Sequence, residues 1–398
     1  MAVVWAIICG LTTVCALAFA AYGIALAIEL WRPLPAADQW EGVTAYQDWT
    51  TGALSFSKLL APHNEHRIPL TKLAILIDFG LFEGRSIFTH CLLLLVHGGL
   101  GVALGLVATR GFAASTRALG VAAGIAFLVS PVQIHNLILP FDLGWAATGL
   151  SGLGAFWWTA RLADPLRQHG RAITTVLAAT ATVLAVYSSA NGLAVAPMVA
   201  VSALVLPVAR ASRVALVSTA VLSVASYFVD YAAWSAAEFQ ASRSVDHGAL
   251  YFLGYVAAFL GSVDPHDFET SLVLGSIGLG IWASVAYKLL SRFRSAGTLD
   301  PSLVALFLLA TLAIATAAMI ALGRGGMGDR LALSSRYTTW SVLFWGSLAG
   351  CVGRFDDAAV PRVAKIATMG LTLALLIVSY VASGLFIRQS RDESRRRL

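Results

Sequence analysis

The chain has 398 residues, of which 58% are hydrophobic and 12% are charged, and its mean hydropathy is +0.77. A soluble domain carries about 25% charged and roughly 45–50% apolar residues. The composition therefore excludes a soluble enzyme, a disordered chain and a disulfide-built secreted domain. The net charge of +6 does not indicate a nucleic-acid partner, because the basic residues stand singly among apolar runs. We predict an all-α, polytopic integral membrane protein.

The N-terminal apolar run at 2–28 lacks a basic start and exceeds the roughly 7–15 residues of a signal-peptide core, so we expect a retained first span. Stretches near the length of a transmembrane helix recur along the chain, and we expect about 11 spans (about 10–13) in one transmembrane domain over 1–398. Their approximate bounds are 3–29, 86–109, 118–135, 142–160, 172–189, 192–209, 214–232, 270–288, 302–322, 338–353 and 365–387.

Two further apolar segments, 68–81 and 249–263, are too short to span and suit interfacial or re-entrant helices. With both excluded as spans, the basic turns fall on one side, which the positive-inside rule makes cytoplasmic. A basic tail at 388–398 would then lie outside, against that rule. The basic turns contain Arg110 and Arg117; Arg161, Arg167 and Arg171; Arg210 and Arg213; and Lys288, Arg292 and Arg294.

The longest polar stretch is the first extracytoplasmic loop, 31–67. A loop longer than about 12–15 residues is usually functional or disordered, and its many aromatic residues favour helices lying in the membrane interface. It ends in Pro62-His63-Asn64-Glu65-His66-Arg67. Pro62 suits a helix start, and on a helix His63, His66 and Arg67 would share one face that could hold a phosphate. A solvated surface helix, or a metal site of His63, Glu65 and His66, are the alternatives.

Three later patches also carry polar residues between apolar runs. At 130–136, Gln133 and Asn136 are costly at membrane depth unless they are paired or face a cavity, although a helix cap is the plainer interpretation. At 187–192, Asn-Gly indicates a tight turn. At 323–338, glycines permit close approach to a ligand and several arginines could clamp a phosphate. A plain connector is the alternative there.

These motifs resemble those of a group of bacterial polytopic membrane proteins that looks like part of the GT-C superfamily, the integral-membrane glycosyltransferases that use polyprenyl-phosphate sugars. The similarity runs from about residue 30 to 350, and the His-Asn-Glu-His-Arg block is its most specific motif. The motifs that carry it are Phe56–Arg67, Ser130-Pro131-x-Gln133-x-x-Asn136, Ala190-Asn191-Gly192, Gly323-Arg324 and Ser335-Arg336-Tyr337.

The resemblance implies a GT-C-like fold in the bacterial inner membrane, with an active site facing the periplasm or cell exterior. It implies an acidic residue in the first loop that acts as base, for which Asp38 and Glu41 match by position and Glu65 lies in the group's own motif. The superfamily often carries two adjacent acidic residues early in this loop, whereas Asp38 and Glu41 are separated by two residues. The resemblance therefore does not decide which acidic residue is the base. The expected partners are a polyprenyl-phosphate-linked sugar, membrane lipids and a glycan, glycolipid or protein acceptor. No cofactor is expected with certainty, and a divalent metal is an alternative. The expected substrate-binding residues are His63, His66, Arg67, Gln133, Asn136, Arg324, Arg336 and Tyr337.

Two other classes of function compete with this one. A transporter or lipid flippase would place charges near mid-membrane and show repeat symmetry, and the sequence shows neither a convincing repeat nor a deep ionisable residue beyond Asp78, Asp142 and Asp230 near predicted helix ends. A non-catalytic scaffold subunit would give no reason for the His-rich and Arg-rich loops to meet.

Overall fold

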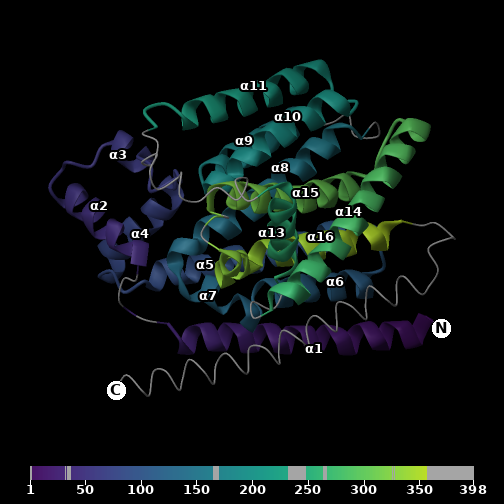
Figure 1. The fold of residues 1–398 in the computed structure, drawn as a ribbon, viewed down its shortest axis with the longest axis horizontal. Helices are drawn as coiled ribbons and strands as arrows, with labels where there is room; N and C mark the ends of the chain where they lie inside the picture. Colours follow the sequence, from purple (N-terminus) through teal and green to yellow (C-terminus); the bar gives the residue numbers. More distant parts are fainter. Residues whose placement is uncertain are drawn as a thin grey trace.

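The computed structural model describes residues 2–31, 33, 37–164, 170–231, 248–262, 267–324, 326 and 328–355 (Figure 1). The expected span 365–387 and the basic tail 388–398 lie outside these residues. Within them the fold is entirely helical. The longer helices are α1 (Ala2–Glu29), α4 (Pro69–Phe82), α5 (Ile87–Ala108), α6 (Ala114–Leu128), α8 (Leu143–Leu162), α9 (Arg171–Val186), α10 (Val195–Val205), α11 (Arg210–Tyr227), α13 (Ala249–Gly261), α14 (Phe268–Ala296), α15 (Pro301–Arg324) and α16 (Thr338–Arg354).

Short helical segments complete the described chain. The first loop holds η1 (Ala37–Trp40), α2 (Glu41–Thr50) and α3 (Phe56–Leu60). Trp40, Trp49 and Phe56 on these segments are exposed, as expected for side chains at a membrane interface. The other segments are η2 (Pro131–Gln133), α7 (Ile134–Ile138), η3 (Pro140–Asp142), η4 (Ala190–Ala194), η7 (Asp329–Leu333) and η8 (Ser335–Tyr337).

Five apolar segments of the described chain are long enough to cross a membrane: Trp5–Glu29, Ile87–Ala108, Ala114–Ile138, Phe268–Ala296 and Pro301–Arg324. This confirms a helical protein with membrane-spanning character, but it does not establish about 11 spans. The expected span 192–209 is helical in α10 only over 11 residues. The two segments expected to be too short, α4 and α13, have 14 and 13 residues.

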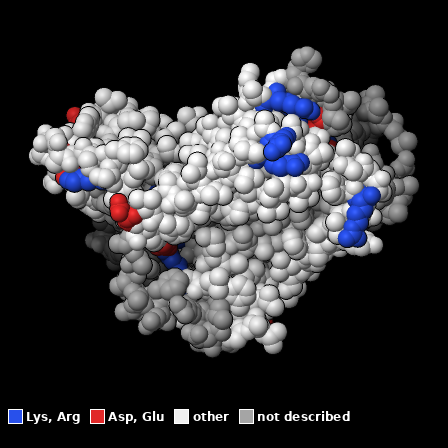
Figure 2. Space-filling model, turned by 90° about the horizontal axis from the view of Figure 1, so that it is seen from above, with Lys and Arg blue, Asp and Glu red and all other residues white. Residues whose placement is uncertain are grey.

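The bundle has two chemically different ends. At one end, called the site end below, the first loop meets the ends of α11 and α15, because Arg67 bonds to Tyr227 and Glu65 bonds to Arg324. At the basic end, Arg354 bonds to the carbonyl oxygens of Ala108 and Arg110. In Figure 1 the site end carries α2, α3 and α4 at the left, and the N-terminus lies at the right. Figure 2 shows Lys and Arg side chains gathered toward the right.

The packing centre is α15, which contacts α5, α8, α13, α14 and α16 (Figure 1). Its side chains Leu306, Leu309 and Leu312 are fully buried, since α15 is apolar around most of its circumference and is enclosed by neighbouring helices. This central position fixes the place of Arg324, the last residue of α15.

Glycines bring α5 and α6 into backbone contact. A Cβ on Gly124 would lie 2.2 Å from the Gly101 carbonyl oxygen, and a Cβ on Gly105 would lie 2.4 Å from that of Gly120. Gly101 and Gly105 on α5, and Gly120 and Gly124 on α6, are each spaced by four residues, which is the small-residue spacing that lets membrane helices approach closely. The pair α5–α6 therefore tolerates no larger residue at these positions.

Candidate functional site

The Pro62–Arg67 block of the first loop is a tight turn, and the predicted helix from Pro62 was wrong. His63 and His66 exchange two backbone hydrogen bonds, of 2.7 and 2.9 Å. Asn64 has a φ of 51°, a left-handed conformation that asparagine tolerates better than most residues. A helix begins only at Pro69. His63, His66 and Arg67 therefore do not form one helical face.

Arg67 anchors this turn to the end of α11. Its Nε donates to the Tyr227 carbonyl at 2.6 Å, and its two Nη groups donate to the carbonyls of Leu60 and Val229. The side chain is buried. The guanidinium that was expected to bind substrate therefore donates hydrogen bonds to three backbone carbonyls and holds the turn against the end of α11.

Both the backbone carbonyl and the side chain of Glu65 are held by neighbouring residues. Its carbonyl oxygen accepts the hydroxyls of Tyr227 and Tyr231, at 2.9 and 3.2 Å. Its side-chain Oε1 accepts from Arg324 and lies 3.5 Å from His66 Nε2. Oε2 is buried without a hydrogen-bond partner among the described residues. The carboxylate of the loop motif therefore meets the cation of the glycine-rich motif at the site end.

The orientation of His66 is fixed by η4. The backbone N–H of Ala190 donates to His66 Nδ1 at 3.1 Å. A nitrogen that accepts a hydrogen bond carries no proton, so the neutral ring has its proton on Nε2, the atom that faces Glu65. The Ala190-Asn191-Gly192 motif thus acts through one backbone amide that sets the tautomer.

Electrostatics keep Glu65 ionised. Burial raises the pKa of Glu65, but the neighbouring His66 and Arg324 lower it more strongly, and the pKa falls below its ordinary value of 4.5. Tyr337 behaves in the opposite way: burial raises its pKa, and the nearby Arg324 opposes that rise without cancelling it. At neutral pH the site contains a carboxylate beside a guanidinium, with a neutral phenol on the inner side.

An aromatic wall closes the inner side of the site. The Trp145 ring lies 6.4 Å from His66 and 5.7 Å from Tyr337, and Tyr337 packs at 5.1 Å against Phe259. On the other arm of the turn, His63 contacts Phe141 at 4.9 Å. These rings surround the ion pair on the protein side with low-dielectric material, which strengthens its interactions with a ligand.

Gln133 and Asn136 bind the polypeptide itself. Asn136 Nδ2 lies 2.9 Å from Gln133 Oε1 and 2.9 Å from Thr339 Oγ1, and 3.2 Å from the Ser335 carbonyl oxygen. Both amide side chains are fully buried. They link the 130–136 segment to η8 and α16, and so position Tyr337. Arg336, next to it, is exposed at the same end.

For Asp38 and Glu41, the two positional candidates for the base, the structure describes the backbone only. The backbone of Asp38 lies in η1 and Glu41 begins α2, but their side chains lie outside the described part. The alternative metal site at His63, Glu65 and His66 does not form: the described residues contain no group of three or more His, Cys, Asp or Glu side chains that could hold a metal ion.

Trp145, Tyr227 and Tyr231 are the site residues that the sequence analysis missed. Trp145 lies in the first turn of α8, and the two tyrosines lie at or just beyond the end of α11. Each stands beside an apolar run, and an aromatic residue at the end of a membrane helix is ordinarily an interface anchor. Only the fold reveals that these three rings meet one turn of the first loop.

Fold and site together define an all-helical protein with several helices able to cross a membrane and a polar site at one end of the bundle. No protein-family model, curated protein or solved structure matches the chain.

Proposed function

We propose that the protein is an integral-membrane glycosyltransferase of GT-C type, which moves a sugar from a polyprenyl-phosphate donor to a glycan, glycolipid or protein acceptor. The site end would face the periplasm or cell exterior of a bacterial inner membrane. The observation that supports this proposal is the meeting of Glu65, His66 and Arg324. A carboxylate beside a cation and an imidazole N–H contains the groups that sugar transfer from a phosphate requires.

The proposed reaction is a direct displacement. The acceptor oxygen bonds to the anomeric carbon, the bond from that carbon to the phosphate oxygen breaks, and the acceptor proton passes to a carboxylate. Arg324 and the His66 Nε2 proton would stabilise the departing phosphate, since preorganised donors at a developing charge are usually the largest catalytic term. The configuration at the anomeric carbon would invert.

Glu65 is the base that this geometry favours. Its Oε2 is buried and has no hydrogen-bond partner among the described residues, while Oε1 pairs with Arg324. A phosphate that binds Arg324 would compete for this pairing and release Glu65 toward the acceptor. Base function requires an ionised carboxylate, and the lowered pKa of Glu65 supplies one at neutral pH. Asp38 and Glu41 remain alternatives by position.

The test compares purified full-length protein, reconstituted in lipid vesicles, with its Glu65→Gln and Arg324→Gln variants. Each is given a radiolabelled polyprenyl-phosphate sugar and candidate acceptors, and binding of polyprenyl phosphate is measured in parallel because it needs no acceptor. Glu83→Gln is the control, since Glu83 is exposed and pairs with Arg85 away from the site.

We expect transfer by the wild type and by Glu83→Gln, at least 100-fold slower transfer by Glu65→Gln, and weakened lipid binding by Arg324→Gln. Positioned acid–base groups contribute about 10²–10⁴-fold to rate. Full transfer by Glu65→Gln with loss in Asp38→Asn or Glu41→Gln would move the base to the other acidic residues. Absence of both transfer and lipid binding in every form would overturn the proposal. Movement of an intact lipid across the vesicle membrane without transfer would favour a flippase.

A further inference from the structure

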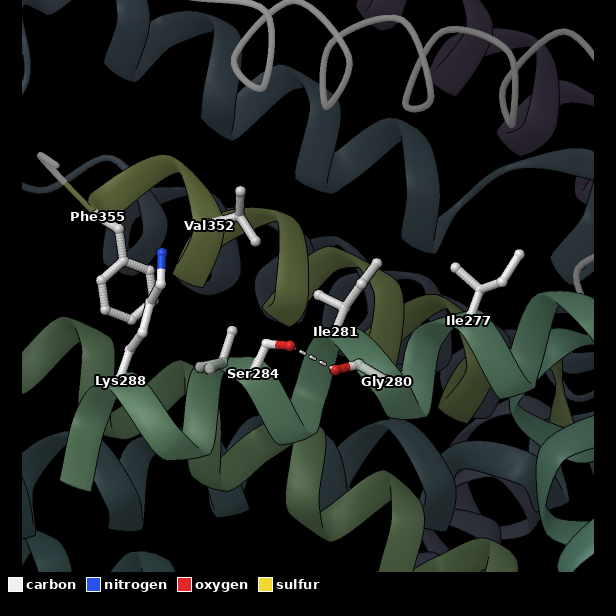
Figure 3. Close-up of a pocket in the computed structure, with 8 residues that line it drawn as sticks. Ile277, Gly280, Ile281, Ser284, Lys288, Val352 and Phe355 are labelled. Atoms are coloured by element: carbon white, nitrogen blue, oxygen red, sulfur yellow. Dashed lines mark hydrogen bonds between the residues drawn. The ribbon is translucent and has the colours of Figure 1, made fainter. Parts of the chain in front are cut away.

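A groove lies between α14 and α16 toward the basic end of the bundle (Figure 3). Its volume is about 280 Å³. One wall is formed by α14 and the other by the end of α16 with Phe355, as the close-up shows. The groove is remote from the Glu65 site: Phe355 follows Arg354, which bonds to Asp300 just before the start of α15, whereas Arg324 is the last residue of that 24-residue helix.

The shape of the groove matches one leaflet of a bilayer. Ile277, Gly280, Ile281, Ser284 and Lys288 line it and recur at three- and four-residue intervals, so they share one face of α14. From Ile277 to Lys288 the helix rises about 16 Å. That distance is about half of the roughly 30 Å hydrocarbon thickness. A single acyl chain of one leaflet has the right length to follow this face.

The groove is apolar along its length and cationic at its end. Lys288 Nζ lies 5.3 Å from the centre of the Phe355 ring, and the Arg292 guanidinium carbon lies 4.7 Å from the same centre. Lys288 makes no ion pair within the described part of the chain. The ring orients both cations beside the mouth of the groove. An amphiphile with an apolar chain and an anionic head complements this arrangement.

We propose that this groove binds an anionic phospholipid of the surrounding membrane, with one acyl chain along Ile277–Ser284 and its phosphate beside Lys288 and Arg292. Basic residues at the membrane surface attract anionic headgroups, and the groove adds a fixed place for the chain. This inference does not depend on the proposed transfer reaction, because the groove and the Glu65 site lie at different ends of the bundle.

The experiment uses full-length protein in detergent micelles, titrated with phosphatidylglycerol or with zwitterionic phosphatidylcholine of the same acyl chains. Bound lipid is counted by native mass spectrometry. Lys288→Gln removes the cation, and Gly280→Leu fills the groove, where a Cβ on Gly280 meets nothing within 4 Å. Ala283→Leu places the same side chain on α14 away from the lining, and Arg294→Gln removes an exposed cation outside it.

We expect the wild type to hold one phosphatidylglycerol at least fivefold more tightly than phosphatidylcholine. Lys288→Gln should weaken this preference at least twofold, since only Arg292 then remains beside the phosphate, and Gly280→Leu should remove the bound lipid, while both controls retain it. Equal affinity for the two lipids, or unchanged binding in Gly280→Leu, would overturn the proposal. The proposal would also be overturned if protein fills the groove. Dissociation of a dimer by Gly280→Leu would indicate that a second copy of the chain occupies it. A disulfide between a cysteine placed at position 284 and one placed within 365–387 would indicate that the chain's own segment occupies it.

Discussion

Glu65 and Arg324 form an ion pair although 259 positions separate them in the chain. Their side chains are 31% and 25% exposed, so water reaches the pair only in part. The pair connects the turn of the first loop to the end of the central helix α15. It joins two motifs that the sequence offered as separate patches.

The coupling between Glu65 and Arg324 should be measurable as a stability term. In a double-mutant cycle of Glu65→Gln and Arg324→Gln we expect about 1 kcal/mol or more, because a partly buried, hydrogen-bonded charge pair is stronger than a surface pair. The exposed Glu83–Arg85 pair provides the matched cycle, with at most about 0.5 kcal/mol expected. Unfolding free energies from detergent denaturation give both values, and equal couplings would contradict the assignment.

The contribution of Glu65 should depend on pH in a defined direction. Its pKa in the folded protein lies below the ordinary value of 4.5. The stability from its ionised form is therefore fully present above about pH 4.5 and is lost as the pH falls through the lower folded value. The difference in unfolding free energy between wild type and Glu65→Gln, measured from about pH 7 to 3, should stay constant and then shrink. A difference that already shrinks between about pH 7 and 5 would show a raised pKa instead.

Arg67→Lys should destabilise the site end despite keeping the charge. Lysine has no planar fork and cannot serve the carbonyls of Leu60, Tyr227 and Val229 together. We expect a loss of about 3 kcal/mol, since each hydrogen bond to a charged group contributes about 1.5–3 kcal/mol and one bond survives in part. Arg85→Lys, at an exposed position, should change stability by less than about 0.5 kcal/mol. Proteolysis of the first loop under native conditions reports whether the loop detaches.

Adding one methyl group at the α5–α6 contact should destabilise the protein. Gly124→Ala places a Cβ 2.2 Å from the Gly101 carbonyl oxygen, so the helices must separate, at a cost of about 1–3 kcal/mol. Gly98→Ala, on α5 where a Cβ would meet nothing within 4 Å, should be neutral or slightly stabilising because alanine favours helix. Thermal unfolding in detergent compares the two variants. A neutral Gly124→Ala would mean that the helices are less tightly packed than described.

The sequence predicted the class of fold because burial in lipid leaves a strong compositional trace. Apolar runs marked helices at nearly every expected place, and they showed that α4 and α13 are short. The run at 192–209 misled, since apolar residues also continue through the non-helical end beyond Val205. Apolarity reports the surroundings of a residue, whereas helix length depends on where backbone hydrogen bonding stops.

The site was only partly predictable for a related reason. His, Glu and Arg residues in loops could be selected as candidates, and Glu65, His66 and Arg324 do lie together. Their geometry could not be foreseen, because the turn at Asn64 depends on carbonyl partners of Arg67 contributed by α11. Pro62 suggested a helix from local preference alone, and the long-range anchor determined the turn.

The two hydrogen bonds between Tyr227 and the Pro62–Arg67 turn have a mechanical consequence. The Tyr227 hydroxyl donates to the Glu65 carbonyl, and the Tyr227 carbonyl accepts a hydrogen bond from the Arg67 side chain. A change in the tilt of α11 would therefore displace the backbone of Glu65, and with it the Glu65 carboxylate.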